Sequence, residues 1–105
     1  MPLLIETADP SAMLQEIKDK IDSNDIKTWS YQGDQFEYLA AQYAPEAVLN
    51  ATVTATEVKF VHAWKKGATK KTYAVMAIYF GRFAEEILSH FDKTSFTRLR
   101  VPALR

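Results

Sequence analysis

The chain of 105 residues contains no cysteine, only three glycines and only four prolines. Without cysteine there is no disulfide bridge, no thiolate nucleophile and no cysteine-ligated zinc or iron–sulfur centre. The three glycines are isolated from one another, so they cannot form a glycine-rich phosphate loop. The sequence therefore predicts a domain with few long loops, whose stability rests on its apolar core.

The residues predict neither a targeting segment nor a membrane-spanning segment. The start, MPLLIETADP, has neither the basic segment nor the long apolar run of a signal peptide. The longest apolar run, around Ala74 to Phe80, is far shorter than the ~20 residues that span a bilayer. We expect a cytoplasmic protein with no membrane partner.

The net charge is zero, but the charges are unevenly divided along the chain. Residues 1–57 carry ten acidic and three basic side chains, a net charge of −7, and residues 58–105 carry the reverse, +7. This division permits an acidic face and a basic face that pair subunits or steer a partner. The alternative, which we favour for a small sheet domain, is that the two halves interleave and the charges mix over the surface.

Composition and periodicity indicate one globular domain. The chain is 48% hydrophobic and 25% charged, and its length suits a single core. Asp9 and Pro10 predict the start of a helix over about 10–23, which Asn24 ends in the left-handed conformation.

Beyond this helix the apolar period changes to two, as in strands. A hairpin is expected over 26–39 around Gly33, followed by strands at 47–54 and 58–64 and a charged turn at 65–71. Residues 72–80 are apolar on both faces, which suggests a central strand covered on both sides. After Gly81 a second helix is expected to about residue 91 or 92, with Leu88 on its buried stripe.

Runs of consecutive strands favour hairpin connections over a doubly wound sheet. The predicted fold class is therefore α+β: a single antiparallel, meander-rich sheet of five to six strands with two amphipathic helices packed on one face. Residues 1–93 form the single domain, and residues 94–105 are either a basic tail or an edge strand.

Two short motifs carry a resemblance. The stretch KTWSY at 27–31 and the stretch GRFAEEILSHFD at 81–92 resemble segments of a group of small, uncharacterised bacterial proteins. No function is known for that group. The resemblance implies an α+β domain and a bacterial, cytoplasmic setting.

The sequence contains few groups of residues that could form a catalytic or metal-binding site. Glu86 and His90 have a spacing that can hold a metal ion, but the only other histidine, His62, lies on a different element. The acids Asp34 and Glu37 lie around the hairpin turn in a polar segment, and a solvated surface is the expected role for such a pair. We expect no catalytic residue, no metal site and no cofactor, and we favour a non-enzymatic protein.

Two groups of residues are candidates for binding. An aromatic cluster on the first hairpin and its exit offers a contact surface, unless one face of that hairpin belongs to the core. It comprises Trp29, Tyr31, Phe36, Tyr38 and Tyr43. A basic patch could bind an anion or a nucleic acid, although a lysine-rich turn is also a common solubility device. It comprises Lys59, Lys65, Lys66, Lys70, Lys71, Arg98 and Arg100.

The leading functional hypothesis is a protein–protein interaction module that self-associates as a homodimer, with the alternating segment 96–101 adding a strand to a neighbour's sheet. One alternative is a small-molecule-binding or enzymatic domain with a pocket between the sheet and the helices. The other, less favoured, is anion or nucleic-acid binding through residues 59–71 and the tail.

Overall fold

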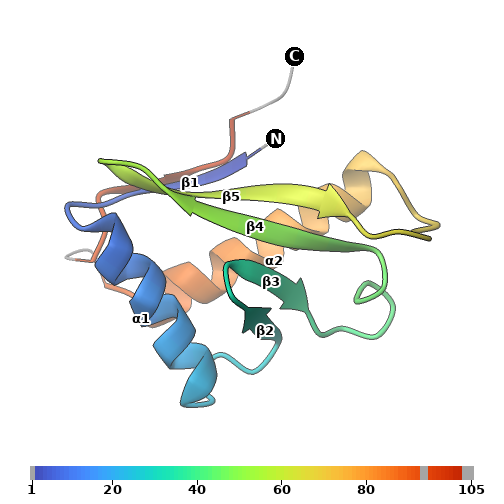
Figure 1. The fold of residues 1–105 in the computed structure, drawn as a ribbon, viewed down its shortest axis with the longest axis horizontal. Helices are drawn as coiled ribbons and strands as arrows, with labels where there is room; N and C mark the ends of the chain where they lie inside the picture. The colour runs from blue at the N-terminus through green and yellow to red at the C-terminus, as the bar shows by residue number, and fades with distance from the viewer. Residues whose placement is uncertain (1, 93–94, 103–105) are drawn as a thin grey trace.

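A computed structural model describes residues 2–92 and 95–102 of the chain. Six strands form one antiparallel sheet in the order β2-β3-β4-β5-β1-β6, and two helices complete the fold (Figure 1). The α+β class predicted from the sequence is confirmed. The elements are β1 (Pro2–Glu6), α1 (Pro10–Asp22), β2 (Trp29–Gln32), β3 (Gln35–Tyr38), β4 (Ala47–Val53), β5 (Glu57–Trp64), α2 (Tyr73–His90) and β6 (Arg98–Arg100).

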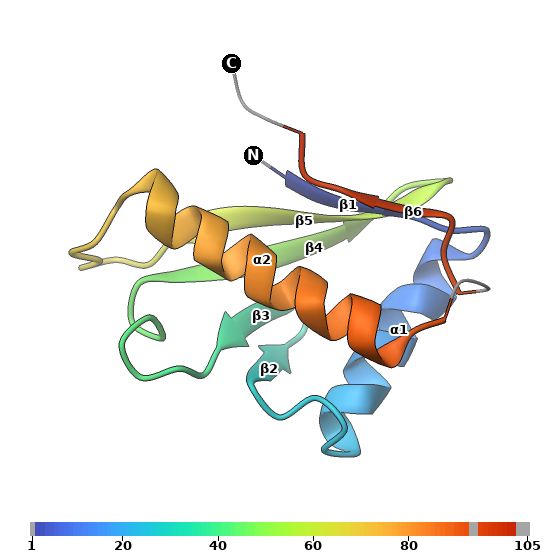
Figure 2. The ribbon, with the colours of Figure 1, turned by 180° about the vertical axis from the view of Figure 1, so that it is seen from behind.

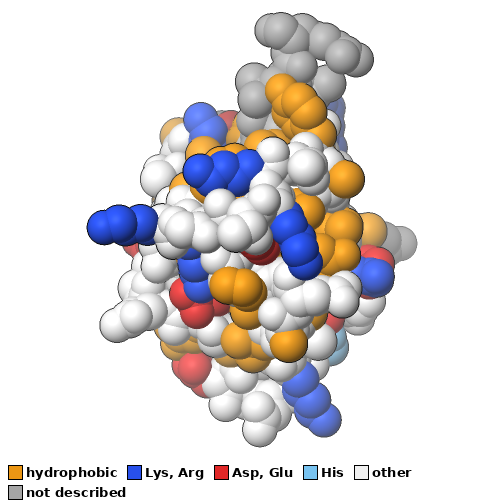
Figure 3. All heavy atoms as spheres, turned by 90° about the vertical axis from the view of Figure 1, so that its right-hand side faces the viewer, with side chains coloured by type: hydrophobic (Ala, Val, Ile, Leu, Met, Phe, Trp, Pro, Cys, Tyr) orange, Lys and Arg blue, Asp and Glu red, His pale blue; other side chains and the backbone are white. Residues whose placement is uncertain are grey.

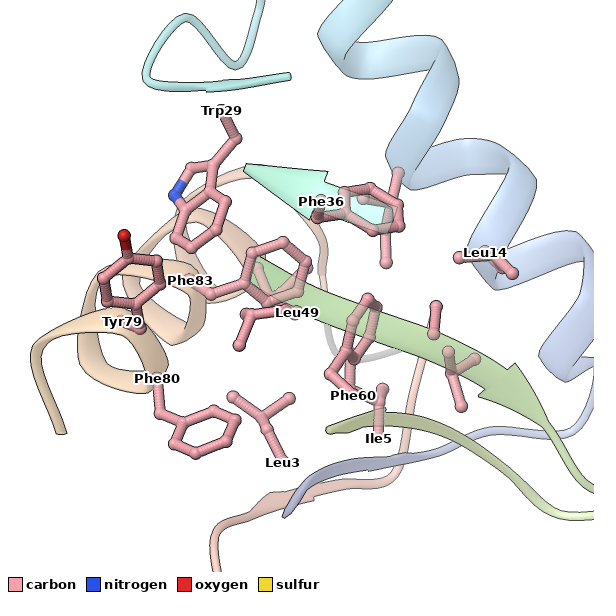
Figure 4. Close-up of a cluster of buried hydrophobic side chains, with 14 of the residues drawn as sticks. Leu3, Ile5, Leu14, Trp29, Phe36, Leu49, Phe60, Tyr79, Phe80 and Phe83 are labelled. Atoms are coloured by element: carbon pink, nitrogen blue, oxygen red, sulfur yellow. The ribbon is translucent and has the colours of Figure 1, made fainter. Parts of the chain in front are cut away.

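Both helices cover the same face of the sheet. Alternate strand residues such as Ile5 and Phe60 point to this face, and they form one buried cluster with Leu14 of α1 and Phe83 of α2 (Figure 4). Seen from behind, α2 passes in front of the strands and α1 lies near its C-terminal end (Figure 2). The core is therefore a single layer between the sheet and the two helices.

Helix α1 begins and ends where its capping residues predict. The carboxylate of Asp9 accepts a hydrogen bond from the backbone N–H of Ala12 at 3.2 Å, and Pro10 takes the first helical position. Asn24 has a φ of 67°, the left-handed conformation expected after the helix.

The hairpins also follow their sequence signals. Strands β2 and β3 pair around Gly33, whose φ of 61° suits a tight turn, although β2 begins at Trp29 and not at residue 26. In the pair of β4 and β5, Leu49 lies opposite His62 and Ala51 opposite Phe60.

The strand predicted over 72–80 is wrong. These residues begin α2, whose first turn is capped by the Thr72 hydroxyl, which accepts the N–H of Val75 at 3.2 Å. The helix continues through Gly81, so its buried stripe repeats every four residues, at Val75, Tyr79, Phe83 and Ile87. The predicted burial of Leu88 is also wrong, since 63% of this residue is exposed.

The tail is an edge strand in its described part. Strand β6 pairs with β1, with Leu99 opposite Ile5. The Nε atom of Arg98 lies 3.2 Å from the carboxylate of Glu6, and that of Arg100 lies 3.6 Å from it. Basic residues from 58–105 thus contact acidic residues from 1–57 within one chain, so basic and acidic side chains mix in this part of the surface.

Candidate functional site

The aromatic cluster predicted on the first hairpin divides between core and surface. Trp29 and Phe36 are fully buried, with their ring centroids 4.9 and 5.8 Å from that of Phe83. They are therefore not available to a partner. The remaining three residues, Tyr31, Tyr38 and Tyr43, are half-buried and pack against the edge of the core.

The predicted basic residues do not form one patch. Residues 65–71, which we call the lysine loop, follow the last residue of β5. Arg98 and Arg100 instead pair with the part of β1 that lies beside the beginning of β5. Lys59 lies near these arginines, because both Lys59 and Arg100 are register partners of Leu4.

A buried acid, Glu46, holds the lysine loop in place. Only 3% of Glu46 is exposed, and its carboxylate accepts the N–H of Thr69 at 3.0 Å, the hydroxyl of Thr69 at 3.1 Å and the N–H of Lys70 at 2.9 Å. Burial by itself favours the neutral acid, but these hydrogen bonds outweigh it and hold the pKa of Glu46 below its ordinary value. The ammonium group of Lys65 also donates to the carbonyl oxygen of Ala44 at 2.8 Å.

A cavity of about 210 Å³ lies where the lysine loop enters α2. Trp64, the last residue of β5, forms one wall, and Lys71, Thr72, Tyr73 and Met76 form the rest. In Figure 3, which faces this end of the molecule, hydrophobic side chains lie between scattered lysine and arginine side chains. The cavity thus lies between the end of β5 and the first turn of α2, and no residue of α1 lines it.

His62 of β5 packs against Trp64, the residue that forms one wall of the cavity. The ring of His62 is 4.5 Å from that of Trp64 and 5.5 Å from that of Tyr79, and its Nε2 atom is buried without a hydrogen-bond partner in the described residues. Burial lowers the pKa of His62, which favours the neutral ring. The group therefore behaves as part of the apolar wall.

Part of the α2 surface outside the core is also apolar, and it lies beside an exposed polar strip that includes Arg82, Glu85 and Ser89. The residues of this apolar part, which we call the outer flank, are Tyr73, Ala74, Ala77, Gly81, Ala84 and Leu88, of which Ala84 is partly buried against the core. At 100° per residue they fall within about a 100° arc of the helix. Tyr73 and Leu88, at 70% and 63%, are the most exposed large apolar residues in the described part of the chain. In Figure 2, α2 passes in front of the strands of the sheet.

The outer flank was not identified as a candidate from the sequence. Its signal was present in the run from Tyr73 to Phe80, which is apolar on both faces. Interpreting that run as a strand assigned both faces to the core of one chain, whereas in the helix only one side is covered by this chain.

The Glu86–His90 pair is a local contact. The Nε2 atom of His90 lies 3.1 Å from the carboxylate of Glu86, which also accepts the hydroxyl of Thr28 at 3.1 Å. Within residues 2–92 and 95–102, no three acidic or histidine side chains gather as a metal site would require.

Comparison with known proteins does not identify the chain: no protein-family model, curated protein or solved structure matches it. Neither described helix has the length and apolar character needed to cross a membrane.

Proposed function

We propose that the chain is a non-enzymatic protein–protein interaction module that self-associates through the outer flank of α2. The observation that carries this proposal is that α2 has a second apolar strip, the outer flank, which the described part of its own chain leaves largely exposed. A surface helix of a globular protein normally has charged and polar residues, not a second apolar strip, on the side away from its core. A second copy would cover the exposed Tyr73 and Leu88.

Gly81 supports the same proposal. It lies in the interior of α2, where glycine costs about 1 kcal/mol relative to alanine. Apart from the adjacent residues and the nearby backbone of α2 itself, a methyl group at this position would meet no atom within 4 Å, so packing within one chain does not require glycine. A glycine on an exposed helix face does allow another backbone to approach closely.

The uncovered face of the sheet is the weaker candidate surface. Two of its apolar residues, Leu4 and Val48, are only 7% and 6% exposed, and Val61 is 39% exposed, less than Tyr73 or Leu88 of the outer flank. Polar residues of β4 and β5, such as Asn50, Thr52 and Lys59, occupy neighbouring positions on the same face. An antiparallel sheet commonly leaves one such face exposed to solvent, without a partner that covers it.

Strand addition through the tail is also less favoured. One edge of β6 is already paired with β1, and the arginines expected to meet a partner's acids contact Glu6 of their own chain. Strand β6 is only three residues long, which limits the backbone pairing that it offers to a neighbour.

A second candidate function is the binding of a small ligand in the cavity beside Trp64. Its support is the combination of aromatic walls with one cation, Lys71, in a concave site. A thermal-shift screen with small aromatic carboxylates and phosphates tests it, with the variant Trp64→Ala as the control. Stabilisation of the wild type only would favour this candidate.

Self-association is tested by light scattering over protein concentrations from about 1 μM to several hundred μM, a range that covers weak specific dimers. Ala77→Glu places a charge within the outer flank and is expected to keep the protein monomeric. Ser89→Glu, on an exposed and differently oriented position of the same helix, is the matched control and should dimerise like the wild type. A wild type that stays monomeric throughout the range would overturn the proposal.

A further inference from the structure

The outer flank has its large side chains at its two ends and small residues between them. Gly81 lies in the middle of α2, and both Ala74 and Leu88 are seven residues from it. At 1.5 Å per residue each is about 10.5 Å from Gly81 along the helix axis. A second α2 that runs antiparallel and crosses at Gly81 therefore brings its Leu88 level with Ala74 and Tyr73.

The cavity beside Trp64 of the first copy lies at this same height along the axis of α2. We infer that Leu88 of each copy fills the cavity lined by Trp64, Tyr73 and Met76 of the other, in an antiparallel, two-fold symmetric dimer. This inference rests on the proposed self-association and adds its geometry. Such an interface is isologous, because the same side chain and the same cavity are used twice.

The size and character of the cavity suit a leucine side chain. Its volume is about 210 Å³, and its walls include the indole of Trp64, the ring of Tyr73 and the thioether of Met76. An apolar cavity of about 150 Å³ accommodates benzene, a larger group than the isobutyl group of leucine. Filling the cavity would cover both of the most exposed apolar residues at once.

Charge favours the antiparallel arrangement. Residues 70–80 carry Lys70 and Lys71 and no acid, whereas residues 81–92 carry Glu85, Glu86 and Asp92 against one arginine, Arg82, which contacts Glu85 at 3.0 Å. In an antiparallel pair the lysines of one copy lie near the acids of the other, and the helix dipoles oppose each other favourably. A parallel pair would bring the two lysine loops together.

The absence of cysteine makes this geometry directly testable by disulfide cross-linking. We would mix the single variants Ala74→Cys and Leu88→Cys in equal amounts, oxidise them and separate the products by mass. The antiparallel dimer predicts the mixed 74–88 disulfide as the main product. A matched control replaces Leu88→Cys by Ser89→Cys, which has its side chain turned by about 100° on the helix and should cross-link much less.

A second measurement uses Leu88→Ala, which leaves the core untouched. It is expected to weaken dimerisation by about tenfold or more, because a buried anchor is lost twice. Fluorescence gives a matched readout: dimerisation should shift the emission of the half-buried Trp64 to shorter wavelength in the wild type and less in Leu88→Ala. Trp29 is buried in either state.

The outcomes separate the two proposals. A dimer with the mixed disulfide and a weakened Leu88→Ala variant supports both. A dimer that gives 74–74 or 88–88 disulfides, or none, and that tolerates Leu88→Ala would overturn the antiparallel geometry and leave self-association standing. A protein that is monomeric at every concentration would overturn both.

Discussion

The carboxylate of Glu46 accepts the backbone N–H of Lys70 at 2.9 Å across 24 residues of sequence. One buried acid at the start of β4 thus fixes a loop that carries four lysines, and through this loop it sets where α2 begins. The cavity beside Trp64 and the outer flank of α2 both depend on that position.

The first prediction concerns the pH dependence of this contact. The folded-state pKa of Glu46 is lowered, so its contribution to stability is present above the unfolded-state pKa and is lost as the pH falls through the folded-state pKa. Glu46→Gln should therefore melt below the wild type at neutral pH, and the difference should shrink in acid. Thermal unfolding followed from about pH 7 to about pH 3 measures it. A difference that stays constant over this range would contradict the assignment.

The second prediction concerns Tyr79, which joins α2 to the segment before β4. Its buried hydroxyl donates to the carbonyl oxygen of Tyr43 and accepts the N–H of Ala47 at 3.2 Å. Tyr79→Phe leaves both backbone groups without this partner and should lower the free energy of unfolding by about 1–3 kcal/mol. Urea denaturation provides the measurement. Tyr73→Phe, at a 70% exposed position, is the control and should change the free energy by less than about 0.5 kcal/mol.

The third prediction separates the two sides of α2. Ile87 is fully buried, so Ile87→Ala should cost about 2–5 kcal/mol of unfolding free energy. Its neighbour Leu88 is mostly exposed, so Leu88→Ala should cost less than about 0.5 kcal/mol when the protein is dilute and monomeric. Denaturation of both variants at low concentration tests this contrast, and equal losses would show that the helix is rotated from its position in the structure.

The fourth prediction is that the lysines of the lysine loop differ in how much they contribute to the free energy of unfolding. Lys66, Lys70 and Lys71 are exposed, and replacing all three by Gln should change the unfolding free energy by less than about 0.5 kcal/mol. The ammonium of Lys65 contacts Glu37 at 3.0 Å as well as the carbonyl oxygen of Ala44, so Lys65→Gln alone should destabilise more than the triple change. Retention of single-stranded DNA at physiological salt by the wild type, but not by the triple variant, would instead establish a nucleic-acid function for the loop.

Local chemistry was enough to predict several elements from the sequence. The start of α1 follows from Asp9 and Pro10, and its end from Asn24, because caps act through atoms only a few residues apart. The first hairpin follows from Gly33 for the same reason, and the alternation of apolar and polar residues over 49–53 predicts β4. These signals fixed the α+β class.

Only the tertiary structure decided residues 72–80 and the surface that depends on them. A run that is apolar at every position has no period, so it fits a covered strand and a helix equally well. The choice fell to long-range packing: as a helix, Val75 and Tyr79 join the stripe of Phe83 and Ile87 over the sheet, and a glycine in the middle costs less than that burial contributes. The same helix leaves Leu88 exposed, which no local rule in the sequence could reveal.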